Sequence, residues 1–444
     1  MTAQLVADDG LPAAEHRRDV GLVRAVGPVA LAASIINIIV GAGIFAVPAA
    51  LAACIGPWAP LAFVICAIAI GSVAICFAEG GSRIPTSGGP YGYIEAAFGP
   101  LVGYTAGTVL WFSDALACGG VAAALASVAV SVLPPAIRTA AHAAIIVGVI
   151  GAIAMINLGG VARGARLVNA ATLLKLIPLG IFVIAGAGAV RGANFLTAMP
   201  PTTGGLGRAL ILALFAFTGM EAALGASGEV VRPARTIPAA LAIAMLVVTL
   251  LYISVQIVAQ GVLGASLAQS TVPLADAMAR ISPTLSALML AGAALSMFGW
   301  IGSDLLGTPR ILFAFARDGL LPRILGRLHP RSHVPHIAIL CYASLATGFA
   351  LTGTFAELAV LSTLGAAALY IAGCAAAWRL AHLGVARAGE PLNFRWLRAA
   401  ALTGIAGMLV LIALASWAEI IGLAAILAAS AALFVLLRRG FRKR

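Results

Sequence analysis

Apolar stretches long enough to cross a lipid bilayer recur along this chain from residue 25 to residue 437. A spanning helix needs about 20 mostly apolar residues. Of the 444 residues, 62% are hydrophobic and only 9% are charged. Soluble domains carry about 25% charged residues. These properties exclude a soluble enzyme with a single anchor, and they predict an all-α integral membrane protein embedded in the lipid bilayer.

We expect twelve transmembrane helices, at about residues 25–54, 58–81, 99–131, 139–159, 168–190, 207–227, 237–263, 284–314, 335–353, 356–380, 396–415 and 417–437. The polar residues 1–24 would then form a cytoplasmic tail, and the basic residues 438–444 would form a second one.

The net charge of +12 comes from basic residues in short connections between the apolar stretches, which indicates membrane topology rather than nucleic-acid binding. With the N-terminus inside, the twelve spans place 22 of the 27 Lys and Arg residues on the inner side and 4 on the outer side. Cytoplasmic connections carry an excess of Lys and Arg. The asymmetry predicts a multi-pass protein of the cell inner (cytoplasmic) membrane, with both termini in the cytoplasm.

The first span contains two glycines in mid-membrane: Gly41 and Gly43 flank Ala42, and Pro48 follows about one turn later. A glycine pair favours local unwinding of a helix. The new helix N-terminus exposes N–H groups and a positive dipole end, which suits a carboxylate. The alternative is close helix packing through small residues.

The sixth span contains Gly219 and Glu221 within residues 214–223. An acidic side chain inside a membrane is energetically costly and marks a functional site by default. The first and sixth spans are five apart, as an inverted five-plus-five repeat requires. Interrupted helices in corresponding positions of two halves are the best sequence pointer to a transporter's binding site.

Four stretches together resemble the amino acid–polyamine–organocation superfamily: residues 40–48, residues 78–100, residues 215–238 and residues 310–322. The resemblance implies a leucine-transporter-like fold. Residues 25–190 would form the first inverted repeat and residues 207–380 the second. Residues 396–437 would add two extra helices.

The resemblance also implies a substrate site between the two interruptions. The substrate carboxylate would rest on the backbone N–H groups of Ala42, Gly43 and Ile44. The substrate ammonium would meet backbone carbonyls around Ile39, Phe215, Ala216 and Thr218. The ring of Phe215 resembles the family's gate over the substrate, although an ordinary packing role is the alternative.

Lys175 lies in the fifth expected span. An ammonium group in a low-dielectric environment releases its proton more readily than in water. In sodium-independent relatives a lysine of this span stands where sodium-coupled members bind the cation, and Lys175 matches that position. We therefore expect Lys175 and Glu221 to take part in proton coupling. The alternative for Lys175 is snorkelling to the membrane surface.

Two further acids lie within expected spans. Asp114 is in the third span, at a level where relatives shape the substrate pocket, and Asp304 is in the eighth. Both could attract a cationic substrate side chain, or they could pair with an arginine such as Arg310. We expect Asp114 to contact the substrate, with a structural or proton-holding role as the alternative.

These observations predict a secondary active transporter of amino acids or amines, sodium-independent and proton-coupled, that works by alternating access. The alternatives are an exchanger of amino acids, amines or polyamines, and more remotely a membrane sensor. Scattered acids argue against an enzyme, and we expect no cofactor or metal because His329, His333 and His336 repeat no ligand spacing. The substrate side chain, the choice between symport and exchange, and the oligomeric state stay open.

Overall fold

The computed structural model describes residues 26–84, 89–160, 175–196, 200–224, 230–317, 319–387 and 391–441. The expected N-terminal tail, the first part of the fifth span and the last three residues lie outside these ranges. Within them the regular structure is helical, apart from one parallel bridge between Val26 and Val230.

The N-terminal half consists of helices that follow the expected spans closely. They are α1 (Pro28–Ile39), α2 (Gly43–Ile55), α3 (Ala59–Arg83), α4 (Pro90–Phe98), α5 (Pro100–Val130), α6 (Arg138–Leu158) and α8 (Leu176–Ala187). Proline opens α1, α4 and α5, because the first N–H of a helix has no intrahelical partner and proline lacks that group.

In the C-terminal half the regular structure of the described residues is also helical. Its helices are α9 (Thr203–Phe217), α10 (Met220–Ala223), α11 (Pro233–Leu263), α12 (Pro273–Ala279), α13 (Pro283–Gly307), α14 (Pro309–Arg317), α15 (His336–Thr352), α16 (Phe355–His382), α17 (Leu397–Ala413) and α18 (Trp417–Phe441).

By length and composition, eight helical segments of the described chain are able to cross a membrane. Four further apolar helices, α1, α8, α15 and α17, are shorter. The chain is thus an all-helical membrane protein. The count of twelve spans and the five-plus-five repeat stay predictions.

Some details differ from the sequence-based expectation. The eighth expected span is divided into α13 and α14, because Pro309 lacks a backbone N–H to continue the helix. The connection before α5 holds the additional helix α4, and α18 continues to Phe441 into the segment expected as a basic tail.

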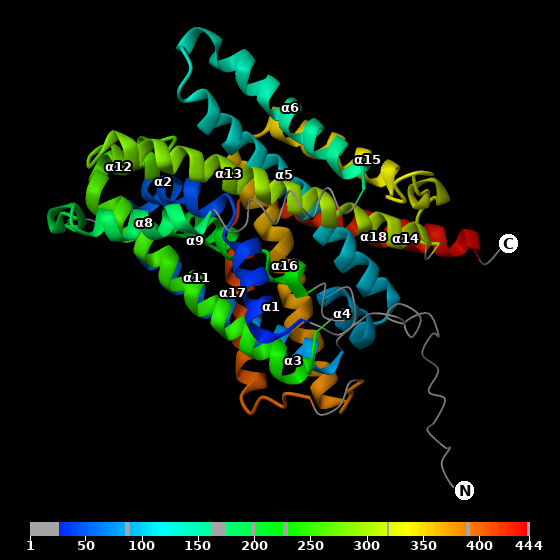
Figure 1. The fold of residues 1–444 in the computed structure, drawn as a ribbon. Coiled ribbons are helices and arrows are strands. Elements are labelled where there is room, and N and C mark those ends of the chain that lie inside the picture. The colour runs from blue at the N-terminus through cyan, green and yellow to red at the C-terminus, as the bar shows by residue number, and fades with distance from the viewer. Residues whose placement is uncertain are drawn as a thin grey trace, which may run out of the picture.

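The helix α16 crosses the bundle and packs against α3, α4, α5, α9 and α17 (Figure 1). A buried aromatic cluster joins three of these helices. The ring of Phe77 in α3 lies 5.8 Å from the ring of Tyr93 in α4 and 5.5 Å from the ring of Tyr370 in α16, both edge to face. Such pairs stabilise a core beyond the area that they bury.

Large apolar side chains also cover the outside of the bundle. Ile184 is 80% exposed, Ile421 65% and Leu246 62%. Extended apolar surfaces are rare on proteins that face water. These side chains are therefore placed to contact lipid acyl chains.

Candidate functional site

The first interruption separates α1 from α2. The helix α1 ends at Ile39 and α2 begins at Gly43. The backbone N–H groups of Ala42, Gly43 and Ile44 have no backbone acceptor in the described part of the chain. As the first N–H groups of a helix they carry the positive end of its dipole. The arrangement is therefore suited to binding an anionic group.

The second interruption separates α9 from α10. The helix α9 ends at Phe217, Thr218 is extended, and Gly219 has a φ angle of 118° before α10 begins at Met220. Only glycine adopts this φ without strain. The interruptions expected near Gly41–Gly43 and Phe217–Glu221 are therefore both present.

The two interruptions lie against each other. A Cβ atom at Gly43 would lie 3.0 Å from Cα of Ala216, and a Cβ atom at Gly219 would lie 2.9 Å from Cγ2 of Ile38. Real Cβ atoms essentially never lie closer than 3.0 Å to such a neighbouring atom. Because the two glycines have no side chain, the broken helices can cross with their backbones close together.

Three side chains from other parts of the chain donate hydrogen bonds to carbonyl groups at and just after the end of α1. The Tyr252 hydroxyl of α11 donates to the Ile39 carbonyl at 2.9 Å, and the Ser296 hydroxyl of α13 donates to the Gly41 carbonyl at 3.3 Å. The Lys175 ammonium, just before α8, donates to the Asn37 carbonyl. Side chains distant in sequence thus hold the frayed end of α1.

Two carbonyl groups expected to receive the substrate ammonium have internal donors in this conformation. The Ile39 carbonyl accepts from the Gly41 N–H at 2.7 Å as well as from Tyr252. The Phe215 carbonyl accepts from the Thr218 hydroxyl at 2.7 Å and from the Thr218 N–H at 3.2 Å. An ammonium group would have to displace one of these donors.

Glu221 is held at the start of α10. Its Oε2 atom accepts hydrogen bonds from the Tyr370 hydroxyl at 2.8 Å and from the Gly219 N–H at 3.1 Å. The carboxyl group is buried and links the second interruption to the central helix α16. Glu221 therefore orients the interruption as well as being a candidate for proton transfer.

Two aromatic side chains flank the interruptions. A Cβ atom at Gly41 would lie 2.5 Å from Cδ1 of Trp300 in α13. The ring of Phe215 packs edge to face on Phe355 at the start of α16, with centroids 5.6 Å apart. Phe215 is therefore part of an aromatic pair between α9 and α16.

Asp114 and Asp304 share a hydrogen-bonded cluster. The Thr308 hydroxyl lies 3.1 Å from Oδ2 of Asp114 and 2.9 Å from Oδ1 of Asp304. The Tyr342 hydroxyl donates to Oδ2 of Asp304 at 2.5 Å. The alternative pairing of Asp304 with Arg310 does not occur among the described residues, because these two hydroxyl groups occupy the carboxyl group instead.

Sequence reasoning did not single out Tyr252, Ser296, Trp300, Tyr342 or Tyr370. Each is a polar or aromatic residue within an apolar helix. Buried polar groups need partners, so a Tyr or Ser within a predicted span is a signal worth following. The identity of the partner is not visible until the helices are packed.

Comparisons with known proteins agree with this architecture. The family model for amino acid permeases matches residues 26–441. A branched-chain amino acid permease of Bacillus subtilis (strain 168) is 28% identical over 354 residues, covering 76% of each protein. A methylthioribose transporter of the same strain is 29% identical over 354 residues, covering 74% of this chain and 76% of the relative.

An uncharacterized transporter of Mycobacterium tuberculosis (strain ATCC 25618 / H37Rv) is 32% identical over 357 residues, covering 73% of each protein. The family match spans both interruptions and every described helix. The chain therefore belongs to the amino acid permease family of the amino acid–polyamine–organocation superfamily, whose members are multi-pass membrane transporters.

Proposed function

We propose that this protein is a secondary active transporter of amino acids in the cytoplasmic membrane, sodium-independent and proton-coupled. It alternates access around the α1–α2 and α9–α10 interruptions, with two inverted repeats at residues 25–190 and 207–380 and both termini inside. The observation that supports the proposal is the crossing of the two interruptions, where Gly43 at the start of α2 lies against Ala216 near the end of α9.

The carboxylate of the substrate binds the N–H groups of Ala42, Gly43 and Ile44. Charge-assisted hydrogen bonds to backbone N–H groups are stronger than neutral ones. The absence of a side chain at Gly43 keeps this approach open. The ammonium replaces the internal donors at the carbonyl groups of Ile39 and Phe215, so substrate binding and rearrangement of the two interruptions are linked.

Lys175 couples the first interruption to proton binding and release. Lys175 is 3% exposed, and its ammonium donates to the Asn37 carbonyl near the end of α1. When protonated, it stabilises the frayed carbonyl end of α1. When it loses its proton, that end is released and the opposite-facing state is favoured. A cation at this place makes a sodium ion unnecessary.

The Asp114–Asp304 cluster supports a proton-holding role for Asp114. A hydroxyl group donates only one hydrogen bond, whereas Thr308 lies within reach of two carboxyl groups. Tyr342 also donates to Asp304, so each carboxyl group can have one donor. The cost that remains is that of two buried negative charges close together, and a proton on one carboxyl group removes it. Because Asp114 is engaged in this network, it is not free to pair with a cationic substrate side chain. The site therefore favours a neutral amino acid over a basic one.

The test is uptake of radiolabelled amino acids into proteoliposomes that contain the purified protein. We expect uptake without sodium, stimulated by an inward proton gradient and inhibited by neutral amino acids. Exchange is the second candidate, because an antiporter would use the same site. Uptake that requires a preloaded amino acid or amine, and that ignores the pH gradient, would establish exchange and contradict symport.

A further inference from the structure

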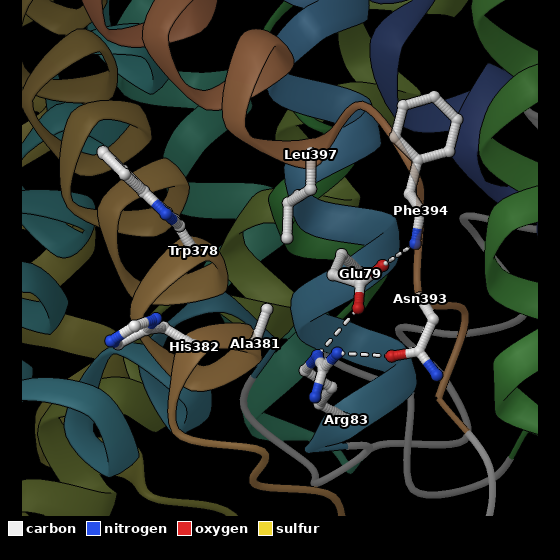
Figure 2. A pocket seen from close by; sticks show the side chains of 8 residues that line it. All are labelled: Glu79, Arg83, Trp378, Ala381, His382, Asn393, Phe394 and Leu397. Carbon is white, nitrogen blue, oxygen red and sulfur yellow. Dashed lines mark hydrogen bonds and ion pairs between the residues drawn. The ribbon is translucent and has the colours of Figure 1, made fainter.

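A cavity of about 310 Å³ lies where α3, the end of α16 and the start of α17 meet (Figure 2). It lies apart from the two interruptions, and it is lined by Glu79, Arg83, Trp378, Ala381, His382, Asn393, Phe394 and Leu397. Figure 2 shows Trp378, Ala381 and His382 on one side and Asn393 and Phe394 on the other, with the Glu79–Arg83 pair beside them.

The acidic group of the cavity is already neutralised. Oε1 of Glu79 lies 2.7 Å from Nε of Arg83, and Oε2 accepts the N–H of Phe394 at 2.9 Å. Arg83 also donates to the Val385 carbonyl at 3.0 Å and to Oδ1 of Asn393 at 2.7 Å. The ion pair therefore forms a fixed wall that ties α3 to the connection between α16 and α17.

Two arginines of the described chain, Arg395 and Arg398, lie next to residues that line the cavity or pack against them. The Arg398 guanidinium lies 5.8 Å from the ring centroid of Trp378, which lines the cavity, and His382 is exposed at the end of α16. The Arg395 guanidinium lies 5.4 Å from the ring of Trp396. The helix α17 begins at Leu397, so its positive dipole end is at the cavity as well. These groups of the described chain favour an anion over a cation.

The exposed side chains beside the cavity are typical of the membrane surface. Trp396 is 63% exposed and Leu383 is 58% exposed on the connection beside the cavity. Tryptophan is enriched at the level of lipid headgroups. Basic pockets between transmembrane helices bind anionic headgroups.

We propose that this cavity binds the phosphate of an anionic phospholipid headgroup, with Arg395 and Arg398 as the recognising cations and Trp396 beside the glycerol region. The headgroup bridges the ends of α16 and α17 and so stabilises the connection that Arg83 holds from the other side. This site goes beyond the proposed transport function and does not depend on which substrate is carried.

The test uses the full chain in neutral detergent and counts bound lipids by native mass spectrometry. Phosphatidylglycerol and phosphatidylcholine are titrated separately. We expect clearly tighter binding of phosphatidylglycerol. Each basic residue near a membrane surface contributes about fivefold to the binding of anionic lipid. The double variant Arg395→Gln/Arg398→Gln should therefore bind phosphatidylglycerol about 25-fold more weakly, whereas Arg398→Lys should keep most of the affinity.

A charge-matched control is available at the other end of the bundle. Arg191 lies at the C-terminal end of α11, because its N–H donates to the Gly261 carbonyl. The cavity lies toward the N-terminal end of α11, because Gly81, close to Arg83, faces Ile237 there. Arg280 lies at the same end as Arg191. It is two residues after Met278, and Met278 lies against Gly186 near the end of α8, shortly before Arg191. The variant Arg191→Gln/Arg280→Gln should bind phosphatidylglycerol like the parent.

Three results would overturn the proposal. Equal affinity for the two lipids would show that the cavity does not recognise charge. An equal loss in the Arg191→Gln/Arg280→Gln control would show a general charge effect. Displacement of phosphatidylglycerol by inorganic phosphate at comparable concentration would identify a site for a free anion instead. Melting temperatures without lipid should match among variants, because all four arginines are exposed.

Discussion

Gly43→Val tests the binding geometry most directly. A Cβ atom at position 43 would lie 3.0 Å from Cα and 3.2 Å from Cβ of Ala216, so the backbone of α9 would have to move. Overpacking of this kind costs about 1–3 kcal/mol. The displacement also removes hydrogen bonds from the substrate carboxylate, each contributing roughly 1.5–3 kcal/mol. Substrate affinity should therefore fall roughly 10- to 150-fold for each bond lost.

The assay is equilibrium binding of radiolabelled amino acid to purified protein, together with uptake into proteoliposomes. Gly43→Ala should give an intermediate loss, because it adds the Cβ atom without the branched γ-carbons. Gly71→Val is the matched control, since a Cβ atom at Gly71 of α3 meets no atom within 4 Å. Parental affinity in a well-inserted Gly43→Val protein would refute the proposed carboxylate site.

Three further predictions follow from the other contacts. Lys175→Ala should leave the protein folded but remove the stimulation of uptake by a proton gradient; sodium-dependent uptake in the parent, or unchanged pH dependence in the variant, would show that this residue is misassigned. Asp114→Asn should alter the pH dependence of uptake while the preference between neutral and basic substrates is kept, because Thr308 holds Asp114 in the acid cluster. A larger loss for lysine or arginine than for alanine would instead make Asp114 a substrate contact. Arg83→Ala should lower the melting temperature strongly, since removing one partner of a buried ion pair costs about 3–5 kcal/mol. A parental melting temperature in detergent would show that the pair with Glu79 is not structural.

Much of the helical architecture was predictable because hydrophobicity is a local property. The helices α5, α6, α11 and α16 begin and end within a few residues of the expected spans. The interruption at Gly219 was predictable for a similar reason, since a φ angle of 118° needs glycine. The division at Pro309 was missed, although proline in an apolar run is itself a signal for a helix boundary.

The contacts of the site were less accessible to sequence reasoning. Composition identified Lys175 and Asp114 as unusual polar groups inside apolar stretches, and the resemblance assigned roles to them. The structure adds that Lys175 contacts the Asn37 carbonyl, and that Asp114 shares Thr308 with Asp304. Thr308 is 194 residues from Asp114, so only helix packing brings the two together.

The sequence by itself determined that this protein lies in a membrane, because apolar length depends only on neighbouring residues. Its glycines predicted breaks in two helices, with close helix packing as the alternative for the first, and the structure shows both breaks. The tertiary structure decided which groups complete the broken ends. Tyr252 of α11, Ser296 of α13 and Lys175, just before α8, reach carbonyl groups at and just after the end of α1. Such pairings depend on how helices cross and at which height, and no local pattern along the chain specifies either.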